Sequence, residues 1–321
     1  MKIIALLFLK ICLDVAVVSG TGGREEGQLR GQDSIQEIPS NTSKFEKPQQ
    51  LPKFFGIDCD ETFLTENAEG LKKNIEAFAE VKKRGFMPFF CTGKPLSSIL
   101  ALLGDDFEAK TGYKGYPGVY NNGSIVYDEN GNVVYSKAFT REFLSTFLKS
   151  IEDGNLSKIC TFHSKDAIYS LIKAEGMWIK YLESQGFSIP EVKTPQEIQE
   201  FEIVNIYIMC ENLKIGDLKE GVDYIAVRSV SGVFDVNPAG VTKMTGMKTL
   251  LSRYNEFPPF CGYIGDGDND VECLDVCSQS FAVGDAKDVA KKHAKWVLSK
   301  SYNDGAVAEA LELLYGPLSV A

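Results

Sequence analysis

The chain has 321 residues and a formal net charge of −10, with 44% hydrophobic and 24% charged residues. This composition is typical of a soluble globular protein, and the length allows two domains or one large domain with an insertion. Nucleic-acid binding requires Lys/Arg-rich surfaces, so no nucleic-acid partner is expected for such an acidic chain. A phosphorylated small molecule is compatible with it, because a bound Mg²⁺ and a few local cations can neutralise a single phosphate.

The amino-terminal part of the chain differs from the rest. Residues 1–20 place Lys2 before two apolar runs and end in small residues, which is typical of a secretory signal peptide. Lys10 and Asp14 interrupt the runs, so no stable membrane span is expected. Residues 21–52 are polar, without apolar periodicity, and are interpreted as a disordered linker. The expected location is the secretory pathway, an endomembrane lumen or the cell exterior, with the cytoplasm as the alternative.

The cysteines do not form the pattern of a disulfide framework. Loss of Cys12 with the signal peptide would leave seven cysteines, an odd number, and several of them lie in or beside apolar strand-like runs. A thiol in such a run behaves as a small buried hydrophobic side chain. We therefore expect free, buried cysteines, which leaves the secretory prediction without support from disulfides.

From Lys53 onward, strand and helix patterns alternate. Residues 54–58 form an apolar strand-like run, and apolar residues recur every three or four positions between Leu71 and Val81, which predicts an amphipathic helix. Residues 87–91 predict the next strand, and the same alternation returns in the last third of the chain. Such alternation predicts an α/β fold in which helices cover both faces of a parallel sheet.

The pattern changes in the middle of the chain. Helix-like segments at 140–152 and 177–185 mix with four strand-like segments, an α+β pattern that fills residues 137–235. We interpret this stretch as an inserted domain. The core domain would then consist of residues 53–136 and 236–321.

Polar residues follow three of the predicted core strands, at the end where open parallel sheets bind ligands. Asp58 and Asp60 follow the first strand, and their spacing on an extended backbone points both carboxylates to one side. One can act as a nucleophile and the other as a general acid/base. Thr92 can donate its hydroxyl to a phosphoryl oxygen, and the acidic loop 265–270 adds oxygen ligands that suit Mg²⁺.

These segments together resemble the four motifs of the haloacid dehalogenase-like superfamily, in particular its Cof-type phosphatase branch. The matching segments are 58–62, 92–94, 240–243 and 265–270, with further matches at 122–124, 282–286 and 303–305. The resemblance covers about residues 53 to 321. It implies a Rossmann-like parallel-sheet core with an inserted C2-type α+β cap domain.

The resemblance also implies a Mg²⁺-dependent phosphatase that forms an aspartyl-phosphate intermediate. Asp58 would be the nucleophile and a metal ligand. Asp60 would protonate the leaving group and activate water, and its backbone carbonyl would contact the metal, which Asp266 would also bind.

Five further residues acquire implied roles around the phosphoryl group. Thr92, Gly93, Lys243 and Asn269 would bind the substrate phosphate. Asp270 would support the site by orienting Lys243 or a metal-bound water.

The sequence departs from the branch at two positions. Glu61 and Met244 stand where the branch commonly has Gly. Neither change removes a functional group that the chemistry needs, although Glu61 adds a negative charge near the phosphate. The departures leave the fold prediction unchanged and put the efficiency of catalysis in doubt.

Other functions are compatible with the same residues. A phosphomutase would return the phosphoryl group to a second hydroxyl of the substrate, and a non-catalytic ligand-binding protein could share the fold. A dehalogenase would not need the acid/base at Asp60, which makes this reading much weaker. The resemblance favours a sugar phosphate as substrate, with nucleotides and cofactor phosphates as alternatives, and a monomer or weak dimer is expected.

Overall fold

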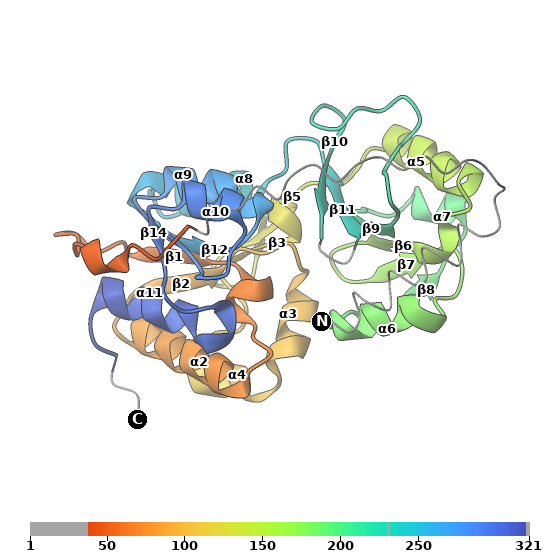
Figure 1. Cartoon of the computed structure of the whole chain (residues 1–321). Coiled ribbons are helices and arrows are strands. Elements are labelled where there is room, and N and C mark those ends of the chain that lie inside the picture. Colours follow the sequence, from red (N-terminus) through yellow and green to blue (C-terminus); the bar gives the residue numbers. More distant parts are fainter. Residues whose placement is uncertain (1–37, 230–231, 319–321) are drawn as a thin grey trace, which may run out of the picture.

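The computed structural model describes residues 38–229 and 232–318, which form two bodies side by side (Figure 1). The predicted signal peptide and the first part of the predicted linker lie outside the described residues. Among the helices that the structure describes, none combines the length and the apolar character needed to cross a membrane.

The larger body is built on a five-stranded sheet in the order β14-β13-β12-β1-β2. All four neighbouring pairs in it are parallel, which confirms the predicted Rossmann-like core. Strand β1, which lies between β12 and β2, is buried at every residue, as expected for a strand covered on both faces. The strands are β1 (Phe54–Ile57), β2 (Met87–Phe90), β12 (Gly262–Gly265), β13 (Gln279–Ala282) and β14 (Trp296–Val297).

Helices cover both faces of this sheet (Figure 1). On one face lie α2 (Ala68–Lys83), α4 (Asp106–Thr111) and α11 (Ala306–Tyr315), with α3 (Leu96–Leu103) between this body and the other. On the opposite face lie α8 (Lys243–Ser252), α9 (Val271–Val276) and α10 (Asp288–His293). Helix α2 begins after Asn67, whose side chain accepts a hydrogen bond from the backbone of Glu69, and it buries Phe78 and Val81 as its periodicity predicts.

A three-stranded antiparallel sheet extends the core beside β2. It consists of β3 (Gly118–Tyr120), β4 (Ile125–Tyr127) and β5 (Val133–Ser136), in that order. The turn between β3 and β4 contains Asn122 at φ +51° and Gly123 at φ +103°. A Cβ atom on Gly123 would lie 2.3 Å from the carbonyl oxygen of Thr242. Only glycine therefore lets this turn approach the start of α8 so closely.

The smaller body is the inserted α+β cap, built on a six-stranded sheet in the order β10-β11-β9-β6-β7-β8. Its strands are β6 (Cys160–His163), β7 (Ile168–Ser170), β8 (Glu191–Val192), β9 (Asn205–Met209), β10 (Tyr224–Arg228) and β11 (Val233–Pro238), and its helices are α5 (Arg141–Asp153), α6 (Gly176–Ser184) and α7 (Pro195–Ile198). Strand β11 pairs with cap strands through Pro238, so the inserted domain runs past the predicted limit at residue 235.

The two faces of the cap sheet have different partners. On β9, Ile206 and Ile208 pack in the cluster that contains Phe147 of α5. Tyr207, between them in sequence, points to the opposite face and packs with Tyr181 of α6. This second face carries the cap residues that face the core.

The seven described cysteines are all free, and six of them are buried. This confirms the prediction of buried thiols, with Cys210 as the half-buried exception.

The prediction of a disordered linker is wrong for residues 38–52, which lie against the edge of the core sheet. Phe45 packs edge-to-face on Trp296 of β14, with ring centroids 5.1 Å apart. The Asn41 carboxamide oxygen accepts a 2.8 Å hydrogen bond from the backbone N–H of Val297. The segment is polar overall, so its sequence pattern does not indicate that its one aromatic residue, Phe45, packs on the edge strand β14.

We expect Phe45→Ala to lower the free energy of unfolding by about 2 kcal/mol, because a partly buried aromatic ring would be lost. A truncated protein that starts at Gln49 should show a similar loss. Urea unfolding measures both, and Glu46→Ala, an exposed neighbour, serves as the control. Equal stability of the truncated and full-length chains would show that the segment contributes nothing to the fold.

Candidate active site

A cavity of about 660 Å³ lies between the core and the cap, at the carboxyl ends of β1 and β12. From the core it is lined by Asp58, Asp60, Gly93, Lys94, Asp266 and Asn269, among others. From the cap it is lined by Tyr181, Gln185, Tyr207, Arg228 and Asp235, among others. At the predicted location beyond the strand ends, the structure therefore has a cavity that can hold a ligand.

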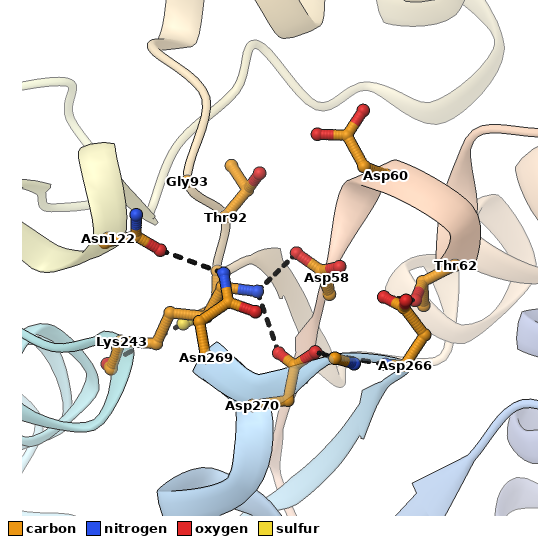
Figure 2. Close-up of polar contacts among 12 residues, drawn as sticks. Asp58, Asp60, Thr62, Thr92, Gly93, Asn122, Lys243, Asp266, Asn269 and Asp270 are labelled. Atoms are coloured by element: carbon orange, nitrogen blue, oxygen red, sulfur yellow. Dashed lines mark hydrogen bonds and ion pairs between the residues drawn. The ribbon is translucent and has the colours of Figure 1, made fainter. Parts of the chain in front are cut away.

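A buried ion-pair cluster forms the floor of this site (Figure 2). The ammonium of Lys243 lies 2.5 Å from Oδ1 of Asp58 and 2.8 Å from Oδ1 of Asp270. Lys243 is the first residue of α8, which is capped by the side chain of Thr242. Because Lys243 is only 1% exposed, its charge is tolerable only with carboxylates this close.

The loop after β12 is wrapped around the carboxylate of Asp270. Oδ2 accepts backbone N–H groups from Asp266 and Gly267, each at 3.0 Å, and Oδ1 accepts the Tyr263 hydroxyl at 2.6 Å. A Cβ on Gly265 would lie 2.3 Å from the carboxyl carbon of Asp270, so this position requires glycine. Both oxygens of Asp270 therefore already have donors, and this residue holds the loop and Lys243 in place.

The cluster has more negative charge than one ammonium can balance. One carboxylate oxygen from each of Asp58, Asp266 and Asp270 lies within 4.8 Å of the others. Burial raises the pKa of Asp58 to about 7, against the opposing effect of Lys243. Burial, followed by the charges of Asp58 and Asp270, also raises the pKa of Asp266 well above its usual range. Closely spaced, partly buried carboxylates of this kind suit a hard divalent cation such as Mg²⁺.

Asp60 differs from Asp58 in its surroundings. It lies in the irregular turn Cys59–Phe63, and its side chain is 54% exposed, on the cavity side and apart from the buried cluster. The next residue, Glu61, has φ +50° and ψ +22°, a left-handed conformation that favours glycine. The departure from Gly at this position therefore changes backbone strain as well as charge, which the sequence alone did not indicate.

The loop after β2 is where the core meets the cap. Thr92 is fully buried, and its hydroxyl oxygen accepts the backbone N–H of Lys94 at 3.2 Å. The carbonyl oxygen of Gly93 accepts the hydroxyl of Tyr207, a cap residue, at 3.1 Å. A side chain at Gly93 would meet Asn122 at 3.2 Å, so the small residue preserves the close approach.

Lys94 links the cap to Asp60. Its ammonium donates to the Gln185 side-chain oxygen at 2.6 Å and lies 3.4 Å from a carboxylate oxygen of Asp60. The ring of Phe187 lies 5.4 Å from the same ammonium. Lys94 is thus buried between a predicted catalytic residue and the end of cap helix α6.

The structure brings the predicted site residues to one edge of the core sheet, and it adds others (Figure 2). Asn269 donates a 3.0 Å hydrogen bond to Asn122, and Thr62 donates one of 3.3 Å to Asp266. Sequence reasoning gave no role to Thr62, Lys94 or Asn122, although each lies inside a motif that it quoted. Tyr263 had no such signal, because it is one apolar residue of a buried strand.

Comparison with known proteins identifies the family to which the chain belongs. The family model of haloacid dehalogenase-like hydrolases matches residues 55–311. The chain is similar to a protein of Streptococcus pyogenes assigned as a phosphatase, with 26% identity over 271 residues, covering 81% of this chain and 97% of the relative. It is also similar to a solved protein from Plasmodium vivax described as a HAD/COF-like hydrolase, with 26% identity, a TM-score of 0.73 and coverage of 83% and 97%.

A more distant solved structure, a sugar phosphatase of HAD subclass IIB, shares the fold with a TM-score of 0.66 at 17% identity, covering 81% of this chain and 97% of that one. The chain therefore belongs to the haloacid dehalogenase-like hydrolases, in their Cof-type branch, and is a phosphoric monoester hydrolase.

Lys243→Met should lower the free energy of unfolding by about 3–5 kcal/mol in the presence of a chelator, because it leaves buried Asp58 and Asp270 without their cation. Chemical unfolding measures the change. Lys248→Met is the matched control, since Lys248 is an exposed residue of the same helix. A Lys243 variant as stable as this control would contradict the assigned ion pairs.

Proposed function

We propose that this enzyme is a Mg²⁺-dependent phosphatase that hydrolyses a small phosphorylated metabolite through an aspartyl-phosphate on Asp58. The observation that carries the proposal is the Asp58–Lys243–Asp270 cluster with Asp266 beside it, at the floor of a cavity. In this proposal the Asp58 carboxylate would attack phosphorus, the Lys243 ammonium would bind the phosphoryl group, and the remaining negative charge would bind a cation.

The metal would be held by the side chains of Asp58 and Asp266 and by the backbone carbonyl of Asp60. Bound there, Mg²⁺ would neutralise charge on the phosphoryl oxygens and keep Asp58 ionised. The second oxygen of Asp58 would attack phosphorus, forming the Asp58 Oδ–P bond as the bond to the leaving oxygen breaks. The hydrogen bond that Asp266 accepts from Thr62 supports the orientation of its carboxylate.

Lys243 supplies a donor for the phosphoryl group. An ammonium has three N–H bonds, and the carboxylates of Asp58 and Asp270 use two of them. The third can donate to a phosphoryl oxygen. Thr92, Gly93 and Asn269 would provide further hydrogen bonds to that group, because they stand around the same end of the sheet (Figure 2).

Asp60 would act as the general acid and then the general base. It would give its proton to the leaving oxygen when the phosphoryl-enzyme forms, and it would take a proton from water when that intermediate breaks down. Its position at the cavity wall, outside the buried cluster, supports this division of roles. The ammonium of Lys94 supports one orientation of the carboxylate.

A sugar phosphate is the favoured substrate. The cavity volume of about 660 Å³ is in the range of small-molecule sites, and the cap lines it with the hydroxyls and amide of Tyr181, Tyr207 and Gln185. Such groups can bind the hydroxyls of a sugar. A screen of phosphorylated metabolites that measures released phosphate and isomerised product separately distinguishes this activity from that of a phosphomutase.

Phosphatase activity towards an aryl phosphate should vanish in excess EDTA and return with added Mg²⁺, because oxygen ligands form the predicted metal site. Asp266→Asn should raise the Mg²⁺ concentration needed for half-maximal activity. Asp268→Asn is the matched control, as this exposed residue of the same loop pairs with Lys287. Full activity in excess EDTA would disprove the metal assignment.

Asp58→Asn and Asp60→Asn should fail at different steps. Loss of the nucleophile in Asp58→Asn should lower the rate by roughly 10⁴-fold or more, without any phosphoryl-enzyme. Asp60→Asn should still be phosphorylated by an aryl phosphate, which has a good leaving group, but it lacks the base that activates water. It should therefore accumulate a phosphoryl-enzyme.

Mass spectrometry after rapid acid quench detects the added phosphate and locates it. Substrates with poor alkoxide leaving groups should leave Asp60→Asn unphosphorylated. Turnover of Asp60→Asn at the wild-type rate, or phosphate on a residue other than Asp58, would contradict the proposed mechanism.

A further inference from the structure

A cluster of amides surrounds a carboxylate at the junction of cap and core. Asp235, on cap strand β11, accepts hydrogen bonds at Oδ1 from Asn205 and, at 3.0 Å, from Asn237. Its other oxygen accepts the Nδ2 group of Asn122 at 2.8 Å. Three amides from three segments thus converge on one carboxylate that the mechanism above does not use.

The hydrogen bonds continue from the cap into the phosphoryl site. The side-chain oxygen of Asn122 accepts the Nδ2 group of Asn269 at 3.0 Å (Figure 2). Asn122 is 2% exposed and lies in the tight turn that Gly123 holds against α8. Asp235, Asn122 and Asn269 therefore form one chain of hydrogen bonds with little freedom at its middle member.

The carboxylate at one end of this series of hydrogen bonds decides which group donates and which accepts in each of them. An ionised carboxylate has no hydrogen to donate, so Asn122 must turn its NH₂ group towards Asp235. Its oxygen then faces Asn269, which must present its own NH₂ group in return. Without such a constraint, an asparagine amide can sit in either of two orientations of nearly equal shape. The carboxylate removes that ambiguity at both asparagines.

The direction matters for a phosphate ligand. A phosphate dianion needs donors, and in the described part of the chain the second N–H of the Asn269 amide has no other hydrogen-bond partner. Asn269 lines the cavity, and its amide nitrogen is turned towards Asn122 and Thr92 in Figure 2. A reversed amide would place an oxygen where this donor now stands.

We propose that Asp235 is a positioning residue that fixes the orientation of the Asn269 amide through Asn122, so that Asn269 donates a hydrogen bond to the phosphoryl group. This inference rests on the proposed function, because it assigns a phosphoryl ligand to the site. It gives the cap a part in building the phosphate site, in addition to enclosing the substrate.

Substitutions that reverse donor and acceptor in the Asn122–Asp235 hydrogen bond test whether this bond sets the orientation of Asn269. In Asp235→Asn, the new amide can keep its oxygen on Asn205 and Asn237 and turn its NH₂ group to Asn122, which reverses both asparagines. We expect a fall in kcat/KM of about 10- to 100-fold, the scale of one hydrogen bond to a charged group. The affinity of this variant for inorganic phosphate, measured as a competitive inhibitor, should fall by a similar factor.

The double variant Asn122→Asp with Asp235→Asn should recover kcat/KM to within a few-fold of wild type. The carboxylate at position 122 would accept from both neighbours, which restores the native orientation of Asn269. A folded double variant with no recovery overturns the proposal and indicates that Asp235 contacts the substrate itself. Burial raises the pKa of Asp235 to about 6, so assays at pH 8 keep the carboxylate ionised.

A measurement on the unaltered protein decides the matter if a variant fails to fold. Inorganic phosphate should shift the side-chain NH₂ resonance of Asn269, assigned through its loss in Asn269→Ser, and an unshifted resonance in a protein that binds phosphate overturns the proposal. Wild-type protein without phosphatase activity would instead refute the proposed function. An active wild type with an equally active Asp235→Asn would refute only the role of Asp235.

Discussion

The ammonium of Lys243, enclosed between the carboxylates of Asp58 and Asp270, is the interaction on which the site depends. These three groups come from α8, from the end of β1 and from the loop after β12, which are far apart in sequence. A buried charge without its partners is costly, so the cluster can form only when all three segments are in place. The arrangement ties correct folding of the core to the position of Asp58, the proposed nucleophile.

Burial, and after it the repulsion among the carboxylates around this ammonium, raises the pKa values of Asp58 and Asp266. Burial and mutual repulsion disfavour the ionised forms, and a divalent cation would reverse both effects. Asp270 differs, because donors occupy both of its oxygens. The site thus combines two carboxylates that are open to a ligand with one that serves as scaffold.

The cap contributes more than a wall of the cavity. It contacts the core through Tyr207 at Gly93, Gln185 at Lys94 and Asp235 at Asn122. Gly93 and Lys94 lie in the loop that carries Thr92, and Asn122 accepts a hydrogen bond from Asn269. The position of the cap and the geometry of the phosphoryl site are therefore coupled by direct hydrogen bonds, each of which involves a buried or half-buried group.

The sequence by itself determined the alternating core, the inserted cap and the acidic residues at the strand ends, because apolar periodicity and strand order decide which side chains reach that edge. It did not reveal Phe45 as an anchor, since one aromatic residue in a polar segment produces no periodic signal. Tertiary structure alone decided the left-handed Glu61, the contacts of Lys94 and the pairing of Asn122 with Asp235, 113 residues away. The contacts of Lys94 and Asn122 depend on how the cap and core sheets are placed against each other, and local sequence patterns do not record that placement.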